Sequence, residues 1–172
     1  MALLNIHIYP DPVLRQRAVP VDMVDRSIRK LIDDMAETMY DAPGIGLAAN
    51  QVGKTLRVIV IDLQKEDYHH GLIALVNPRI IAESGTIIWE EGCLSIPDYY
   101  STVKRSEKVT VEGLDPDGKR IEIHAEGLLA VALQHEIDHL NGKLFIDHLN
   151  PIKRDLFKRR WKKRQRQQAV HS

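Results

Sequence analysis

The segment from Gln134 to His139 reads Gln-His-Glu-Ile-Asp-His and holds the residue types best suited to chemistry in this chain. It contains His-Glu-x-x-His inside an apolar-periodic stretch, which predicts a helix. Because residues four apart share one helix face, His135 and His139 can present two imidazole nitrogens to a single metal ion. Glu136 lies one step round the helix, within reach of a water on that metal. The spacing therefore predicts metal-assisted hydrolysis.

The residues around this pattern predict that the helix is buried. It is apolar nearly all round, through Leu128, Leu129, Val131, Ala132, Leu133, Ile137 and Leu140. Buried histidines need polar partners, and one metal ion supplies a partner to both rings. The alternative, an exposed helix face that happens to carry two histidines, does not fit this apolar surround. Asp138 is expected to face solvent or to form a salt bridge.

A catalytic centre of the zinc type usually has three protein ligands and one open position, so a third ligand is needed. Asp147 and His148 lie downstream of the helix, after a predicted turn. Cys93 lies upstream, between Gly92 and Leu94, at the end of a predicted strand. A lone cysteine is most often an inert core residue, although its thiolate is a strong metal ligand. On residue type alone we favour the inert core residue for Cys93, and the identity of the third ligand stays open.

A helix, a run of strands and two further helices must position these residues. The first helix is expected from Val24 to Met39, with Asp22 or Asp25 as its N-cap. Strands are expected at 57–63, 72–76, 79–82, 86–89, 101–114 and 119–124, the last two as a hairpin, with a polar connection at 65–70. The metal helix should span 126–140, and the last helix should begin at Asn150-Pro151. This order predicts an α+β fold: antiparallel β-sheets around a central metal-binding helix, with N-terminal and C-terminal helices.

Length and charge predict a single catalytic domain, residues 1–150, followed by a basic C-terminal helix and tail, residues 151–172. From Lys153 onward the chain has nine basic residues and one acid, so 15 basic and 23 acidic residues precede Lys153. The single cysteine excludes an internal disulfide framework. No secretory signal pattern and no apolar run of membrane-spanning length is present, so we expect a cytoplasmic protein with no membrane partner.

Three segments together resemble the motifs of the peptide deformylase family, in that family's order and in its bacterial type 1 form. They are Gly44-Ile45-Gly46-Leu47-Ala48-Ala49-Asn50-Gln51, Glu91-Gly92-Cys93-Leu94-Ser95 and Gln134-His135-Glu136-Ile137-Asp138-His139. Residues 9–15 resemble the N-terminal segment of the family. The likeness spans about residues 5–150.

The resemblance implies an enzyme that removes the formyl group from N-formylmethionine of newly made polypeptides and releases formate. It implies metal ligation by Cys93, His135 and His139, with water in the fourth position. The metal is expected to be Fe(II), with zinc, nickel or cobalt as substitutes.

The resemblance also implies the roles of the groups around that metal. Glu136 is expected to act as general base and then acid on the metal-bound water. The side-chain amide of Gln51 and the backbone N–H of Leu94 are expected to stabilise the oxyanion.

An apolar slot is expected to bind the methionine side chain, although the same residues could be ordinary core. Its candidates are Ile45, Gly46, Trp89, Leu128, Val131 and Ala132. Backbone groups of Ile45, Gly46 and Gly92 could pair with an extended peptide. Tyr100 stands where many bacterial relatives carry Arg, and it is expected to form an aromatic edge. Arg105 is expected to be a buried cation near the site.

The basic tail has two interpretations, a solvated helix end or a surface attracted to nucleic acid. Because deformylases of this type act on chains leaving the ribosome, the ribosome near its exit tunnel is an expected partner. Two rival functions are a general metalloprotease and a non-catalytic RNA-associated domain with a structural metal. Cleavage of internal peptide bonds would favour the first, and a closed fourth position would favour the second.

Overall fold

The computed structural model describes residues 2–65 and 71–171, so most of the predicted polar connection at 65–70 and the final residue of the tail lie outside it. The helices are α1 (Arg26–Asp41), α2 (Leu128–Leu140) and α3 (Pro151–His171), with 3-10 turns at Pro12–Arg15, Ala49–Val52 and Phe145–His148. The strands are β1 (Gly46–Ala48), β2 (Val58–Ile61), β3 (Ile73–Ser84), β4 (Ile87–Cys93), β5 (Ile96–Arg105), β6 (Lys108–Leu114) and β7 (Arg120–Glu126).

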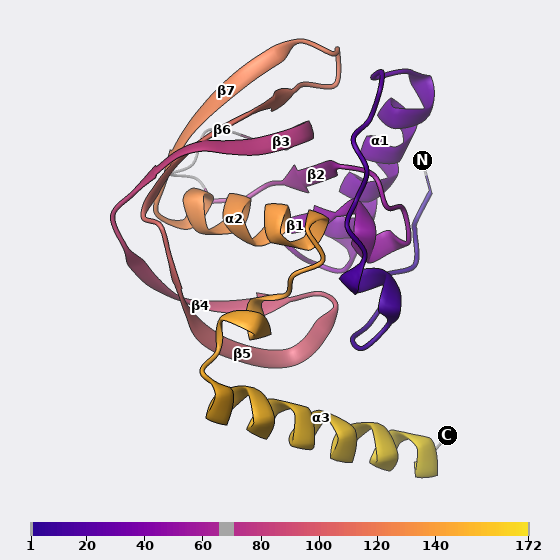
Figure 1. The fold of residues 1–172 in the computed structure, drawn as a ribbon. Coiled ribbons are helices and arrows are strands. Elements are labelled where there is room, and N and C mark those ends of the chain that lie inside the picture. The colour runs from indigo at the N-terminus through magenta and orange to yellow at the C-terminus, as the bar shows by residue number, and fades with distance from the viewer. Residues whose placement is uncertain (1, 66–70, 172) are drawn as a thin grey trace.

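The predicted α+β class, with antiparallel sheets around a central helix, is confirmed. A five-stranded sheet has the order β1-β2-β3-β6-β7, and β4 and β5 form a separate two-stranded sheet. Every pairing between these strands is antiparallel. Figure 1 shows α2 between the five-stranded sheet and the β4–β5 hairpin, with α1 beside β1 and β2 and α3 below the hairpin. The central helix therefore faces strands on two sides.

Strand β2 is apolar at every position because helices cover both faces of the sheet there. Ile59 and Ile61 belong to the core cluster that contains α2. Val58 and Val60 belong to the cluster that contains α1. Alternate residues of a strand point to opposite faces, so a strand buried on both sides reads as a continuous apolar run. The sequence predicted a buried strand here, and the structure confirms it.

The prediction of two separate strands at 72–76 and 79–82 is wrong, because a single strand, β3, runs through both segments. The pairing with β6 shifts between Val76 and Arg79, and Asn77 has a φ of 53°. Asn77 tolerates this conformation because its side chain is held, accepting from the backbone N–H of Val21 and donating to its carbonyl at 2.8 and 2.9 Å. The Asn-Pro pair marks a bulge within a strand, not the end of one.

The prediction of a single strand at 101–114 is also wrong, because this segment is divided between β5 and β6. Residues up to Arg105 belong to β5, which pairs with β4, whereas β6 begins at Lys108 and pairs with β3 and β7. Gln134 of α2 binds the backbone between the two strands. Its Oε1 accepts from the N–H of Ser106, and its Nε2 donates to the Ser106 carbonyl. A tertiary contact between segments 28 residues apart divides this β-rich run into two strands.

Helix α3 packs under the β4–β5 hairpin through one side. Phe157 and Trp161 are buried in a cluster with Leu14 and Ile96. The Trp161 ring N–H donates to the carbonyl of Tyr9 at 3.0 Å, which ties the last helix to the N-terminal segment. Within the described ranges, no helix is both long and apolar enough to cross a membrane.

Candidate metal centre

The structure brings Cys93, His135 and His139 together. Each offers one ligand atom, and the three atoms lie within 4.8 Å of one another. Cys93 is the last residue of β4, while the two histidines lie one turn apart on α2. Within residues 2–65 and 71–171, these three form the only group of His, Cys, Asp and Glu side chains with such geometry. One thiolate and two imidazoles form a donor set that suits Fe(II), zinc, nickel or cobalt.

A hydrogen bond orients the imidazole ring of His135 for this role, whereas Nδ1 of His139 has no hydrogen-bond partner among the described residues. Glu91 Oε1 lies 2.8 Å from Nδ1 of His135, which leaves Nε2 to face Cys93. The Nε2 atom of His139 lies 3.3 Å from the Cys93 sulfur. Asn50 donates to the His139 carbonyl at 2.8 Å and fixes this end of α2. A carboxylate behind a ligand histidine is the usual arrangement in metal sites, so the residues present fit a bound metal.

A buried ion-pair network lies behind Glu91. Arg105 has a side chain only 4% exposed, and it donates to both carboxylate oxygens of Glu91 at 2.8 and 2.9 Å. Its Nη1 also donates to Asp138 at 2.6 Å, so Asp138 forms the salt bridge that was one of its two predicted roles. Burial acts to raise the pKa of Asp138, but the hydrogen bond from His148 and the charge of Arg105 together lower it to about 2. The network holds these carboxylates ionised.

The two downstream candidates for the third ligand lie elsewhere. Asp147 pairs with Arg15 at 2.6 Å and caps the turn at Leu144. His148 lies 2.9 Å from Asp138, on the far side of the network from the convergent atoms. The geometry therefore favours the upstream cysteine over either of them.

Glu136 lies beside the three convergent atoms with an unused oxygen. It is 5% exposed, and its Oε1 is among the buried polar atoms of the described residues that have no hydrogen-bond partner. Burial raises the pKa of Glu136 to about 7. Gly46 leaves room for it, since a Cβ added at Gly46 would lie 2.4 Å from Glu136 Oε2. A buried carboxylate with a free oxygen and a pKa near neutrality suits a group that accepts and returns a proton.

Gln51 is held with its amide directed at the site. Its Oε1 accepts from the N–H of Ala48 at 2.9 Å, which turns Nε2 toward Ser95 Oγ at 3.0 Å and Cys93 Sγ at 3.5 Å. The residue is 1% exposed. Leu94 follows the cysteine, and its backbone begins the turn between β4 and β5. Both predicted oxyanion donors therefore lie next to Cys93.

A cavity of about 670 Å³ opens over the centre, and Cys93, His135 and Glu136 are part of its wall. Each predicted substrate-binding residue lines it: Ile45, Gly46, Trp89, Gly92, Tyr100, Leu128, Val131 and Ala132. Its described lining includes Glu90, Glu91, Asp98 and Glu136 but no Lys or Arg. The cavity is therefore apolar with acidic groups, and it leads directly to the convergent atoms.

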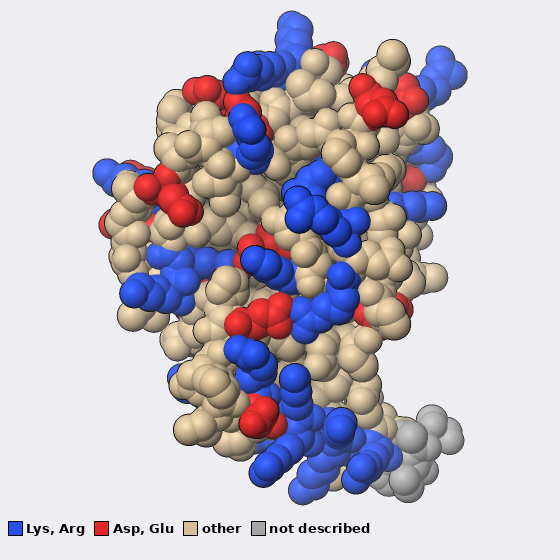
Figure 2. All heavy atoms as spheres, viewed as in Figure 1, with Lys and Arg blue, Asp and Glu red and all other residues tan. Residues whose placement is uncertain are grey.

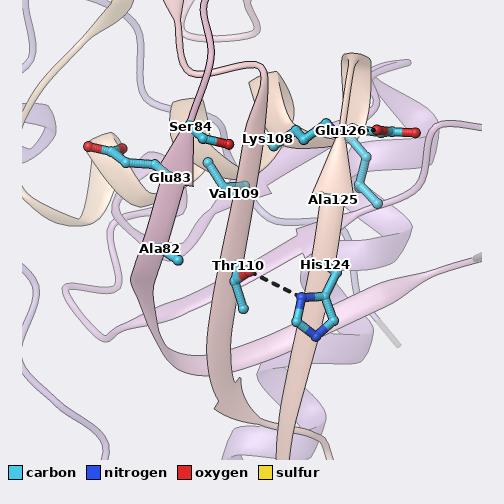
Figure 3. Close-up of a pocket in the computed structure, with 10 residues that line it drawn as sticks. Ala82, Glu83, Ser84, Lys108, Val109, Thr110, His124, Ala125 and Glu126 are labelled. Carbon is cyan, nitrogen blue, oxygen red and sulfur yellow. Dashed lines mark hydrogen bonds and ion pairs between the residues drawn. The ribbon is translucent and has the colours of Figure 1, made fainter.

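A second hollow of about 570 Å³ lies over β3, β6 and β7, away from this centre. Figure 3 shows its residues, with Thr110 hydrogen-bonded to His124 and with Lys108 and Glu126 at the strand ends. His124 is exposed and Thr110 is half-buried. Among described residues the only metal-type cluster lies in the first cavity, so the chemistry belongs there.

Sequence reasoning did not assign roles to Glu91, Asn50 or Ser95. Glu91 carried one usable signal, because the three residues that follow it in the motif, Gly92, Cys93 and Leu94, are all predicted site residues. Its pairing with Arg105 could not be foreseen, since 14 residues and a strand reversal separate the two. Asn50 reaches across 89 residues to α2, which no local pattern predicts.

Comparisons with known proteins agree with this geometry. The family described as polypeptide deformylase matches residues 3–155. A peptide deformylase of Syntrophobacter fumaroxidans is 65% identical over 164 residues, covering 95% of this chain and 96% of that protein. A crystal structure of a peptide deformylase from Legionella pneumophila superposes with a TM-score of 0.89 at 51% identity, covering 97% of this chain and 98% of that one. The peptide deformylase of Ehrlichia chaffeensis in complex with actinonin gives a TM-score of 0.90 at 41% identity, over 96% and 99% of the two chains.

Proposed function

The chain belongs to the polypeptide deformylase family and is a hydrolase that removes the N-formyl group from new polypeptides, and from this premise we propose which residues perform each step. The proposal rests above all on one observation. A buried carboxylate with an unpartnered oxygen, Glu136, lies beside the convergent Cys93, His135 and His139 at the wall of an open cavity.

Cys93, His135 and His139 hold the catalytic metal, and Fe(II) is its natural form, with zinc, nickel or cobalt able to substitute. When bound, the metal lowers the pKa of water and polarises the formyl carbonyl. Glu91 keeps His135 in the tautomer that directs Nε2 to the metal. Purification without oxygen, followed by elemental analysis, tests the metal assignment; zinc alone in fully active protein would refute the iron form.

Glu136 accepts a proton from the attacking water and returns it to the departing amine nitrogen. Its burial supports this role, because a carboxylate with a pKa of about 7 can both take up and release a proton near neutral pH. The side-chain amide of Gln51 and the N–H of Leu94 donate to the formyl oxygen as negative charge develops on it. The Ala48 contact supports this, since it orients the Gln51 amide in advance of substrate.

The peptide binds as an extended strand between two unpaired edges. Among the residues that the structure describes, β1 pairs only with β2 and β4 only with β5. Each therefore has an edge without a partner strand there, and residues of both strands line the cavity. Backbone groups of Ile45, Gly46 and Gly92 are available to such a strand. The methionine side chain occupies the apolar part of the cavity formed by Trp89, Leu128, Val131 and Ala132. Backbone recognition suits an enzyme that serves many different polypeptides.

The Glu136→Gln variant tests the central assignment. We expect it to retain metal by elemental analysis and to lose roughly 10²- to 10⁴-fold in turnover of a formyl-Met peptide, the usual contribution of a positioned acid–base group. An acetyl-Met peptide and an internal amide serve as comparison substrates for the unmodified enzyme. Metal-loaded Glu136→Gln protein with nearly full activity would refute the assignment of Glu136 as the base.

Helix α3 docks the enzyme on the ribosome near the exit tunnel, so residues 151–172 act as a basic helix and tail beside a catalytic unit of residues 1–150. Lys158, Arg159, Arg160, Lys162, Lys163 and Arg166 are exposed on this helix. Figure 2 shows a concentration of Lys and Arg at the end of the molecule where Figure 1 places α3. Such a surface attracts nucleic acid phosphates through counterion release.

Charge reversal tests this docking better than truncation, because Phe157 and Trp161 belong to the core. We expect Arg159→Glu combined with Lys163→Glu to weaken ribosome binding and to flatten its dependence on salt. Turnover of a short formyl peptide should be unchanged. Equal ribosome affinity for the variant and the unmodified protein across salt concentrations would refute the docking role.

A further inference from the structure

We propose that Ser95 is a positioning residue for the reaction, whose buried hydroxyl fixes the side-chain amide of Gln51 in the orientation that donates to the formyl oxygen. Ser95 lies in the turn between β4 and β5 and is not among the described residues that line the cavity. It therefore acts through Gln51 and not on the substrate. The inference rests on the role proposed above for Gln51 as an oxyanion donor.

Two hydrogen bonds set the plane and the direction of the Gln51 amide. Its Oε1 accepts from the backbone N–H of Ala48 at 2.9 Å. Because a backbone N–H can only donate, this contact identifies the oxygen end of the amide. Its Nε2 donates to Ser95 Oγ at 3.0 Å. Each end of the amide thus has its own partner, and the amide cannot rotate without losing a hydrogen bond.

The NH₂ group of Gln51 has two hydrogens, and Ser95 accepts only one of them. The other is on the side of Cys93, whose sulfur lies 3.5 Å from Nε2. Gln51 and Ser95 are 1% and 0% exposed, so solvent has little access to the hydrogen bond between them. The Ser95 hydroxyl therefore leaves the second N–H directed at the convergent atoms, where the formyl oxygen would lie.

Residues 7–9 hold the backbones of both partners. The N–H of Tyr9 donates to the Ser95 carbonyl at 2.8 Å, and the N–H of His7 donates to the Gln51 carbonyl at 2.7 Å. One short segment thus joins two residues that are 44 positions apart in sequence. An acceptor fixed in this way holds the amide in place before the substrate arrives, and donors placed in advance are the ones that stabilise an oxyanion most effectively.

The Ser95→Ala variant removes the hydroxyl and retains the backbone contact with Tyr9. One buried N–H of Gln51 then lacks its acceptor, and the amide loses its fixed direction. We expect kcat per bound metal for a formyl-Met peptide to fall about tenfold with little change in KM, because a small displacement of a catalytic group costs up to about 10²-fold in rate. Elemental analysis should give the same metal content as in the unmodified protein.

A double variant separates positioning from a general structural role. If Ser95 acts only through the amide, adding Ser95→Ala to Gln51→Leu should leave kcat at the value of Gln51→Leu alone. A purely structural loss would lower kcat by the same factor in both backgrounds. Thr38→Val is the matched control, because it also removes a buried hydroxyl that accepts a backbone N–H, from Leu4 at 2.9 Å, but on α1. It should leave kcat unchanged.

The possible outcomes distinguish this inference from the role of Gln51 on which it rests. A Gln51→Leu variant with full kcat would overturn both. If Gln51→Leu is impaired, then an unchanged kcat in Ser95→Ala, or a change in KM alone, would overturn only the inference about Ser95. Equal factors in the two backgrounds, or an equal fall in Thr38→Val, would also overturn it.

Discussion

Replacing Glu91 by glutamine removes the charge at the junction between the proposed metal ligands and the buried ion pairs. Glu91 is 5% exposed, and it joins His135 Nδ1 at 2.8 Å to the two guanidinium nitrogens of Arg105. Glutamine keeps the size of the side chain but carries one oxygen and one NH₂ group. If its oxygen takes the place of Oε1, it can still accept from His135 and from Nη2 of Arg105, but its NH₂ group then faces the N–H of Arg105 Nε, which loses its acceptor.

The expected cost follows from the burial of the pair. Removing one partner of a buried ion pair usually costs about 3–5 kcal/mol, because the other charge is left without compensation. Asp138 remains 2.6 Å from Arg105 and compensates part of that charge. We therefore expect a loss near the lower limit, about 3 kcal/mol in the free energy of unfolding. Loss of a carboxylate behind a ligand histidine also weakens metal binding by about 10- to 100-fold.

Two measurements on the same protein check these numbers. Urea unfolding of the metal-free protein gives the stability, and competition with a chelator gives the metal affinity. Glu112→Gln is the matched control: Glu112 also pairs with two arginines, Arg79 and Arg120, but their side chains are 73% and 71% exposed. Solvent screens that pair, so the control should unfold at nearly the same urea concentration as the unmodified protein.

The outcome that would refute this reasoning is a Glu91→Gln protein with unchanged urea midpoint, unchanged slope and unchanged metal affinity. That result would mean that the charge of Glu91 contributes neither to the stability of the fold nor to metal binding. A loss of stability with full metal affinity would refute only the orienting role assigned to the hydrogen bond between Glu91 and His135.

Three further perturbations test other parts of the structure. Gly46→Ala should abolish most activity, because the new methyl group would lie 2.4 Å from Glu136 Oε2. Formate release measures the activity, and metal analysis shows whether the centre is still loaded. Normal turnover would contradict the close approach of Gly46 to Glu136. Gln51→Leu should lower kcat by about 10²- to 10³-fold with a small change in KM, as expected for a lost oxyanion donor; a change in KM alone would reject that role. Asp138 has its pKa lowered from 3.8 to about 2, so its ionised form contributes about 2 kcal/mol of stability above pH 4, and this contribution is lost as the pH falls from 4 to 2. Asp138→Asn should therefore be less stable than the unmodified protein in urea at pH 7, and the difference should vanish near pH 2; a gap that persists there would contradict the linkage.

Local patterns predicted much of the fold. Apolar spacing and a cap at Asp22 or Asp25 predicted α1, and the structure shows that Asp25 accepts from the N–H of Ile28 at 3.0 Å. The apolar run of β2 and the Asn-Pro start of α3 were also predicted, since each depends on residues adjacent in sequence. The strand limits at Asn77 and Ser106 were not, because a bulge and a contact from Gln134 set them. Local propensity gives way wherever a distant side chain supplies the hydrogen bonds.

By itself, the sequence determined that two imidazoles and a carboxylate share one turn of a buried helix, because helical periodicity fixes the spacing of neighbours. Only the tertiary structure decided that the lone cysteine lies beside them, 46 residues from His139 in sequence but 3.3 Å away in space. It also decided that Glu91 and Arg105 stand behind His135 and that Tyr100 covers Gly92. These placements depend on how two sheets close around α2, and chain topology sets that closure, not any local preference.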